Sequence, residues 1–148
     1  CPETKTPTGV EVDAKHAAAT AAFSKRELLL KDCTHWPEKK DCGQECLAQI
    51  EGSPETCLVR NILSNWYQDH ACVYCEKPFT EIHWHDHKPV FRNSDGDFLE
   101  WHQLKAEDLP EILETHLAVC WDCFIAENFR RKYPDLVIDR PRRRSTLP

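Results

Sequence analysis

The sequence predicts an α+β protein made of two small modules, the first helical and rich in cysteine, the second combining a β-hairpin with helices. Nine cysteines and ten prolines in 148 residues, with a mean hydropathy of −0.62, indicate two small cores that depend on cross-links or metal. Helical periodicity dominates the first half of the chain. The second half adds short β-like stretches around a turn-forming segment.

The N-terminal module, residues 1–68, is expected to be mainly helical. Residues 1–9 are predicted to be an irregular lead-in. The alanine-rich run 13–23 predicts a helix that its first residue, an aspartate, caps. The run of leucines at 28–30 predicts a short buried strand.

Two further helices are predicted in this module. The first spans about 38–50 and is closed by Gly52, because glycine favours the left-handed conformation at a helix end. The second begins at Ser53, has Pro54 in the first helical position, and places apolar side chains at helical spacing as far as Trp66. These two helices are expected to form an αα-hairpin.

The second module, residues 69–134, begins with β character and ends in helices. The Asn-Ser-Asp-Gly-Asp segment at 93–97 is a turn signal, and it predicts a hairpin whose arms are 82–84 and 98–101. Helical periodicity follows, and the last helix is expected to end before a proline. These two helices are predicted at about 109–117 and 124–133.

Two Cys-x-x-Cys pairs in the second module predict a metal site. The pairs are Cys72 with Cys75 and Cys120 with Cys123. Such a turn places both sulfurs on one side of a tight loop, and two such turns are a usual way for a small domain to hold tetrahedral Zn²⁺. Four sulfurs leave no open coordination position, so the site is expected to hold the fold together. A disulfide and a thioredoxin-like redox pair are the alternatives.

The order of elements around these cysteines resembles the treble-clef zinc finger. The first pair precedes the predicted β-hairpin, the second pair opens onto the predicted last helix, and the resemblance covers residues 72–133. It implies that one zinc ion joins the first turn to the N-terminus of that helix. Free N–H groups and the helix dipole would stabilise thiolates there and favour metal.

The N-terminal module holds the other five cysteines, and they predict a second metal site. Cys42 and Cys46 are four residues apart and share one helix face, and Cys1 and Cys33 complete a set of four thiols. Cys57 is an alternative ligand in place of Cys1, a disulfide partner for Cys42 or Cys46, or a buried apolar thiol. Zinc is the expected ion. An iron–sulfur cluster, with electron transfer as the function, uses the same four thiolates.

The segment Asp86-His87-Lys88-Pro89 resembles the HNH nuclease family. The resemblance implies that His87 is the general base for a water that attacks phosphate, and that Asp86 helps to hold a catalytic divalent metal. The final helix departs from the family, because apolar residues at 124–126 stand where HNH proteins carry polar groups. A divergent nuclease is therefore the alternative function.

Three histidines alternate in the same region. His83, His85 and His87 would project to one face of the predicted strand, whereas Asp86 would face the other way. Local hydrogen bonding on a half-exposed strand is our main interpretation of these side chains. An additional histidine-based metal site is the alternative.

Charge is divided unevenly along the chain. The net charge is −6, yet residues 130–148 hold seven basic and two acidic residues, a surplus of five, so the remainder carries about −11. The end of the chain, 135–148, is predicted to be a basic tail that is either solvated or in contact with nucleic acid or anionic lipid. The arginines that would make this contact are Arg140, Arg142, Arg143 and Arg144.

We expect a non-catalytic zinc-binding protein that acts as a binding or accessory component of a larger assembly. Tryptophan is enriched at interfaces, which suits a protein partner, but at least three of the five tryptophans are expected to fill the two small cores. No small-molecule substrate is evident. No run approaches the roughly 18 apolar residues of a membrane span, so a membrane-spanning anchor is expected only ahead of Cys1.

Overall fold

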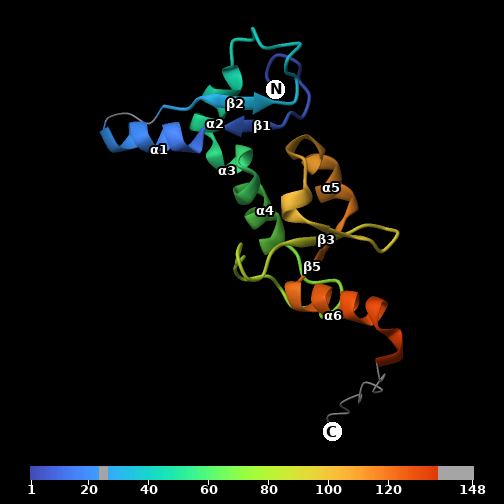
Figure 1. The fold of residues 1–148 in the computed structure, drawn as a ribbon. Coiled ribbons are helices and arrows are strands. Elements are labelled where there is room, and N and C mark those ends of the chain that lie inside the picture. The colour runs from blue at the N-terminus through green and yellow to red at the C-terminus, as the bar shows by residue number, and fades with distance from the viewer. Residues whose placement is uncertain (24–26, 137–148) are drawn as a thin grey trace.

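The computed structural model describes residues 1–23 and 27–136 and has the predicted α+β class (Figure 1). Helices and two small antiparallel sheets alternate along the chain. Within the described residues, no helix is long and apolar enough to cross a membrane. The helices and strands are β1 (Val10–Val12), α1 (Ala14–Phe23), β2 (Leu30–Cys33), α2 (Glu45–Gly52), α3 (Pro54–Cys57), α4 (Val59–Gln68), β3 (Val90–Arg92), β4 (Phe98–Glu100), α5 (Leu109–Thr115), β5 (Leu117–Val119) and α6 (Trp121–Lys132).

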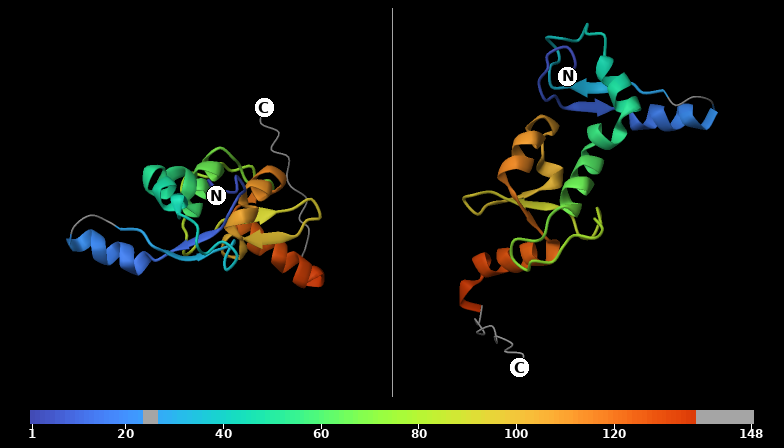
Figure 2. Two further views of the ribbon diagram at one scale, coloured as in Figure 1. Left: turned by 90° about the horizontal axis from the view of Figure 1, so that it is seen from above. Right: turned by 180° about the vertical axis from the view of Figure 1, so that it is seen from behind.

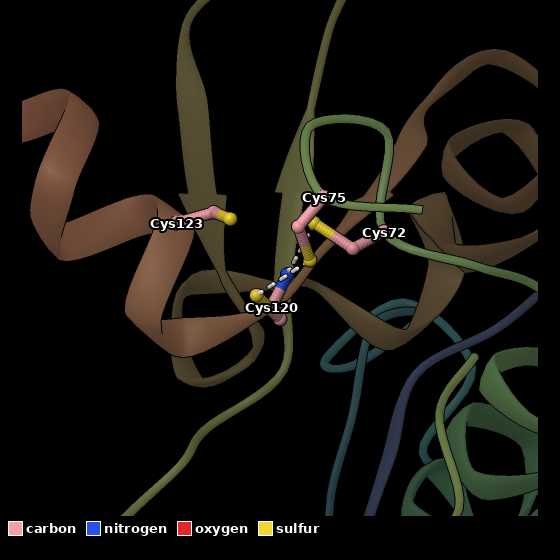
Figure 3. Close-up of side chains that lie close together, drawn as sticks. All are labelled: Cys72, Cys75, Cys120 and Cys123. Carbon is pink, nitrogen blue, oxygen red and sulfur yellow. Dashed lines mark hydrogen bonds between the residues drawn. The ribbon is translucent and has the colours of Figure 1, made fainter. Parts of the chain in front are cut away.

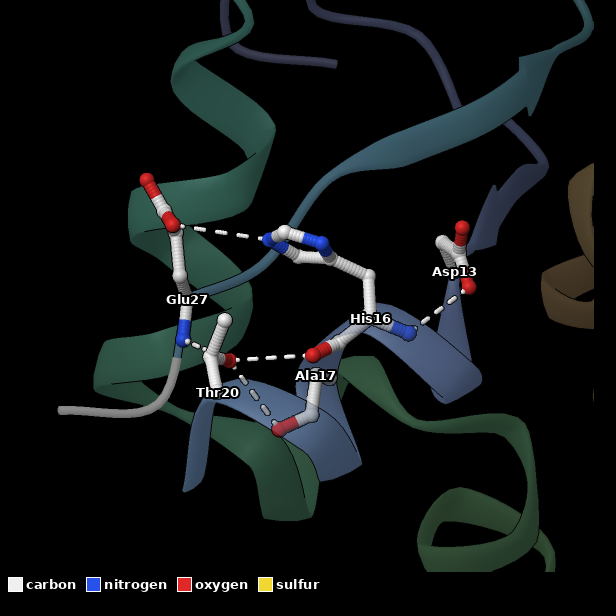
Figure 4. Close-up of polar contacts among 5 residues, drawn as sticks. All are labelled: Asp13, His16, Ala17, Thr20 and Glu27. Carbon is white, nitrogen blue, oxygen red and sulfur yellow. Dashed lines mark hydrogen bonds and ion pairs between the residues drawn. The ribbon is translucent and has the colours of Figure 1, made fainter. Parts of the chain in front are cut away.

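The N-terminal part is built on a two-stranded ribbon of β1 and β2, with α1 between them in sequence. Asp13 caps α1 as predicted, because its Oδ1 accepts hydrogen bonds from the N–H groups of Lys15 and His16, both at 3.0 Å. The N–H of Glu27 donates to Thr20 Oγ1 at 3.0 Å, which ties the start of the next segment to this helix (Figure 4). All three ribbon views show α1 extending sideways from the rest of the molecule (Figure 2).

Two helix predictions in this part are corrected by the structure. The helix expected over 38–50 begins only at Glu45, because turns occupy the preceding residues and Gln44 has a left-handed φ of 52°. The helix expected after Ser53 is two helices, because the extended backbone of Leu58, with φ −80° and ψ 123°, ends α3 and starts α4. Pro54 does occupy the first helical position.

The C-terminal sheet has the strand order β4-β3-β5, all antiparallel. The turn at 93–97 is present, and Gly96 adopts a φ of 89° that favours glycine. The predicted arm at 82–84 is wrong: the strand that pairs with β4 is Val90–Arg92. Val90 and Phe91 are both fully buried, so packing on both faces of the sheet decides which segment forms the arm.

Three apolar clusters run along the length of the molecule. The first packs Ala17, Leu28 and Ile50 beside the β1–β2 ribbon. The central cluster joins α4 to the second module, because Leu63 and Tyr67 of α4 pack with residues of β3, α5 and β5. The third cluster surrounds the Cys-x-x-Cys pairs. Helix α4 therefore leads from the N-terminal ribbon into the core that supports these pairs (Figures 1 and 2).

Candidate metal centre

The first Cys-x-x-Cys pair forms a tight turn ahead of the sheet. Ala71 and Pro78 bridge across its base, and the N–H of Glu76 donates to the carbonyl of Cys72 at 2.8 Å. Glu76 has a left-handed φ of 60°, which brings the chain back after Cys75. The turn therefore holds Cys72 and Cys75 on one side of a closed loop.

The second pair sits where β5 passes into α6. Cys120 is the N-cap residue of α6 and Cys123 lies in its first turn, as the sequence predicts. The N–H of Val73 donates to the carbonyl of Ala118 at 3.0 Å, and this bond ties the first turn to β5. A backbone contact thus brings together two segments that are more than 40 residues apart.

The four thiols converge on one point (Figure 3). The ligand atoms of Cys72, Cys75, Cys120 and Cys123 all lie within 4.8 Å of one another, and the Sγ atoms of Cys75 and Cys120 are 3.8 Å apart. A tetrahedral ion with metal–sulfur bonds of about 2.3 Å separates its sulfurs by about 3.8 Å. Among the described residues, no other group of three or more Cys, His, Asp or Glu side chains converges in this way. These cysteines could hold a metal ion.

The pKa of the Cys72 thiol differs from the pKa values of the neighbouring thiols Cys120 and Cys123. Burial raises the pKa of Cys72, but hydrogen bonds from the backbone of Cys120, Cys75 and Tyr74 outweigh burial and bring that pKa down to about 7. One of these bonds runs from the N–H of Cys120 to Cys72 Sγ at 3.3 Å. Burial raises the pKa of Cys120 and of Cys123, and the adjoining thiols reinforce the rise at Cys123. The cluster therefore stabilises one thiolate by itself and requires a cation to stabilise four.

The surroundings of this cluster are apolar. Cys72 is 1% exposed, and the cluster around it includes Val90 of β3, Val119 of β5 and Phe124 of α6. The four sulfurs thus lie where the first turn, the sheet and α6 meet. An ion bound there would connect all three elements.

The other five cysteines line a single cavity of about 470 Å³ in the N-terminal part. They include the predicted second set, Cys1, Cys33, Cys42 and Cys46, together with Cys57. Their sulfurs do not gather at single-ion spacing, so a second one-ion site remains a prediction. All nine cysteines of the chain are free thiols in the structure, and the disulfide predicted as an alternative is not formed.

The histidine segment differs from the prediction. His83, His85 and His87 do not alternate along a strand, because residues 84–86 form a turn and His83 pairs with His87 across it. Asp86 is exposed at this turn. The carboxylate that faces His87 belongs to Asp122, whose Oδ1 is 3.9 Å from Nε2 of His87.

Sequence reasoning missed the contact between His87 and Asp122. The two residues are 35 positions apart, and they meet only because α6 starts beside the turn at 83–87. Asp122 lies between the two cysteines of the second pair, and this is the one local sign of its place near the centre. The four arginines of the predicted tail contact lie outside the described residues.

The chain matches no protein-family model, no curated protein and no solved structure in the comparisons made.

Proposed function

We propose that this protein is a non-catalytic zinc-binding component of a larger assembly, with one structural zinc ion held by Cys72, Cys75, Cys120 and Cys123. The observation that carries the proposal is the convergence of four thiols, two of them at the 3.8 Å spacing that suits a tetrahedral ion. Four thiolates favour zinc or iron over hard cations, and a shell closed by sulfur leaves no position for substrate. We further propose a treble-clef-type arrangement, in which the ion joins the first cysteine turn to α6.

Metal analysis of the full chain tests the identity of the ion. Protein purified without added metal should hold about one zinc in this centre, and a strong chelator should remove the zinc and unfold the elements around it together. A Cys120→Ser variant should lose this zinc, whereas Ala126→Ser, an exposed change on the same helix, should retain it. Iron in place of zinc would contradict the proposed metal, and an unchanged metal content in Cys120→Ser would contradict the site.

An exposed apolar stripe on α6 supports the binding role. Ile125 and Phe129 lie four residues apart in α6, and Tyr133 is the C-cap residue of this helix; their exposed fractions are 50%, 48% and 41%. Ile125 and Phe129 share one helix face, and the ring of Tyr133 lies beside that of Phe129, with ring centroids 5.1 Å apart. Lys132, in the last turn of the same helix, favours an acidic partner, whereas Arg130 is paired with Glu127 and Arg131 donates to the carbonyl of Gly96. Apolar surface beside positive charge is typical of a face that another protein covers.

A double variant tests this face. Ile125→Ser together with Phe129→Ser should abolish co-purification of the partner with the tagged full chain and leave the zinc content unchanged. Ala126→Ser serves as the matched control. Equal recovery of the same partner with the double variant would show that the binding surface lies elsewhere on the protein.

A nuclease is the second candidate function, and one observation favours it. His83, His87, Lys88 and Asp122 line a cavity of about 250 Å³ beside the cysteine centre. A histidine beside a carboxylate is the pairing that activates water for attack on phosphate. Asp86, the residue that the HNH resemblance implies, is exposed and lies outside this cavity's lining.

Plasmid cleavage with Mg²⁺ or Mn²⁺ tests the nuclease. Loss of cleavage in His87→Ala would establish the role of the histidine. Comparison of Asp122→Asn with Asp86→Asn then separates the two candidate carboxylates. Intact plasmid with wild-type protein at both metals would remove this candidate.

A further inference from the structure

The N-terminal cavity gathers cysteines from distant parts of the chain. Cys1 belongs to the lead-in, Cys33 ends β2 and Cys42 lies in the loop before α2. Cys46 is in the first turn of α2, and Cys57 ends α3. Five thiols from five segments around a single space of about 470 Å³ are more than the packing of a small apolar core requires.

The rest of the lining favours a soft, thiol-bound group. Apolar side chains from the ribbon and from α2, α4 and α5 make up much of the wall, among them Val10, Leu30, Ile50, Ile62 and Leu109. An apolar wall keeps water from thiolates and from whatever they bind. Thiolate ligands select zinc, copper(I) and iron–sulfur clusters over hard cations.

The distances between the sulfurs distinguish a single-ion site from a cluster site. A single tetrahedral ion needs its sulfurs about 3.8 Å apart; in the C-terminal centre the Sγ atoms of Cys75 and Cys120 have this spacing, and all four sulfurs lie within 4.8 Å of one another. Among the described residues, the N-terminal thiols do not form a second group that converges as those four do. In a cluster of four irons, each cysteine binds a different iron, so the four sulfurs stand farther apart than they do around one ion. A cavity of about 470 Å³ lined by five thiols fits the larger group.

The contacts of Cys57 distinguish it from the other four cysteines of the cavity. Cys1, Cys42 and Cys46 also line a second, adjoining hollow. The thiol of Cys57 lies 3.8 Å from the carbonyl oxygen of Gln49, to which it donates, and its side chain packs against the Ala17, Leu28 and Ile50 cluster. Cys57 therefore has apolar and backbone partners of its own.

We propose that the N-terminal cavity binds a four-iron, four-sulfide cluster through Cys1, Cys33, Cys42 and Cys46. Each thiol releases its proton when it binds iron. Cys57 lines the wall of the cavity and does not bind iron. The site is independent of the zinc centre proposed above, because no cysteine belongs to both.

Anaerobic reconstitution of the full chain tests the proposal. The protein is incubated with equal amounts of ferrous and ferric iron and with sulfide, under a thiol reductant, and then freed of excess reagents. Bound iron, acid-labile sulfide and zinc are measured, together with visible absorption and the electron paramagnetic resonance signal after dithionite reduction. The expected result is about four irons and four sulfides per chain, with the four cysteines as ligands.

Matched variants in the same cavity give the ligand assignment. Cys1→Ala and Cys42→Ala should lose the cluster, whereas Cys57→Ala should retain it. Zinc at the C-terminal centre should stay at about one per chain in all three variants, which separates loss of a ligand from loss of folding.

Three results would overturn the proposal. A second zinc without iron would show a one-ion site. A mass lower by two hydrogens before reduction, restored by reduction, would show a disulfide between these cysteines. Retention of iron in Cys1→Ala with its loss in Cys57→Ala would reject the ligand set. Failure of the zinc proposal would appear differently, as absence of zinc in a protein that still binds iron.

Discussion

Removal of the Cys72 thiol should abolish the stabilisation of the second module by zinc. Cys72 is 1% exposed, and its Sγ accepts the N–H of Cys120 at the start of α6. In Cys72→Ser the fourth sulfur is lost from a cluster that connects the first turn, the sheet and α6. The matched control is Val73→Ser in the same turn, because Val73 is 41% exposed and its one bond into β5 uses the backbone N–H.

The size of the effect follows from linkage. Apparent binding free energies of structural zinc in finger peptides are about 10–16 kcal/mol, comparable with the whole stability of a small domain at about 5–15 kcal/mol. Free zinc at about 100 times Kd adds about 2.7 kcal/mol, and about 1 kcal/mol shifts Tm by roughly 4–8 °C in a domain of about 60–100 residues. Wild-type protein should therefore gain roughly 10–20 °C in Tm with zinc.

The assay is thermal unfolding followed by circular dichroism, without zinc and over a series of buffered free zinc concentrations. Serine also buries a hydroxyl in an apolar cluster at a cost of about 1–3 kcal/mol, so the zinc dependence of Tm is the informative quantity rather than Tm itself. Val73→Ser should respond to zinc as the wild type does, and Cys72→Ser should not respond. A zinc-dependent rise in Cys72→Ser equal to that of the wild type would refute the reasoning.

Three further changes test the fold around the sites, each by urea unfolding unless stated. Tyr67→Phe removes a 2.6 Å hydrogen bond from the buried phenol to the carbonyl of Val90 and should cost about 1–3 kcal/mol. Burial raises the pKa of Tyr67, so the phenol loses its proton in the unfolded state before it does so in the folded state. The stability of the wild type should therefore fall as pH rises above about 10, and the stability of Tyr67→Phe should fall less. Leu63→Ala, at a side chain with 0% exposure, should cost about 2–5 kcal/mol, whereas the exposed change Asn65→Ala should stay within about 0.5 kcal/mol. Asp13→Ala removes the cap of α1 and should cost about 0.5–2 kcal/mol, visible as reduced helical ellipticity; an unchanged spectrum and midpoint would show that the cap is dispensable.

Local signals in the sequence predict several elements well. Asp13 marks the start of α1, Pro54 the start of α3, and the segment at 93–97 the hairpin turn, because caps, prolines and turn residues act on their immediate neighbours. The end of α6 before Pro134 has the same local origin. Predictions that depend on these short-range effects agree with the structure within a few residues.

Other features depend on contacts that no local pattern contains. The sequence does not predict β5, because Leu117–Val119 is a strand only by pairing with β3. The sequence pattern places the hairpin arm at 82–84, whereas the strand that pairs with β4 is Val90–Arg92. No proline or glycine at Leu58 indicates the break between α3 and α4. In each case burial against another part of the chain selects the conformation.

The two sets of cysteines likewise separate what the sequence predicts from what the tertiary structure decides. Sequence alone predicted the four cysteines that converge at the C-terminal centre, since each Cys-x-x-Cys turn places its own two sulfurs together. Only the tertiary structure decided that Cys72 receives the N–H of Cys120, that Asp122 rather than Asp86 faces His87, and that all five N-terminal thiols line one cavity. The spacing of two cysteines along the chain sets the positions of their sulfurs within one turn. Whether two distant turns meet depends on the burial of apolar side chains between them.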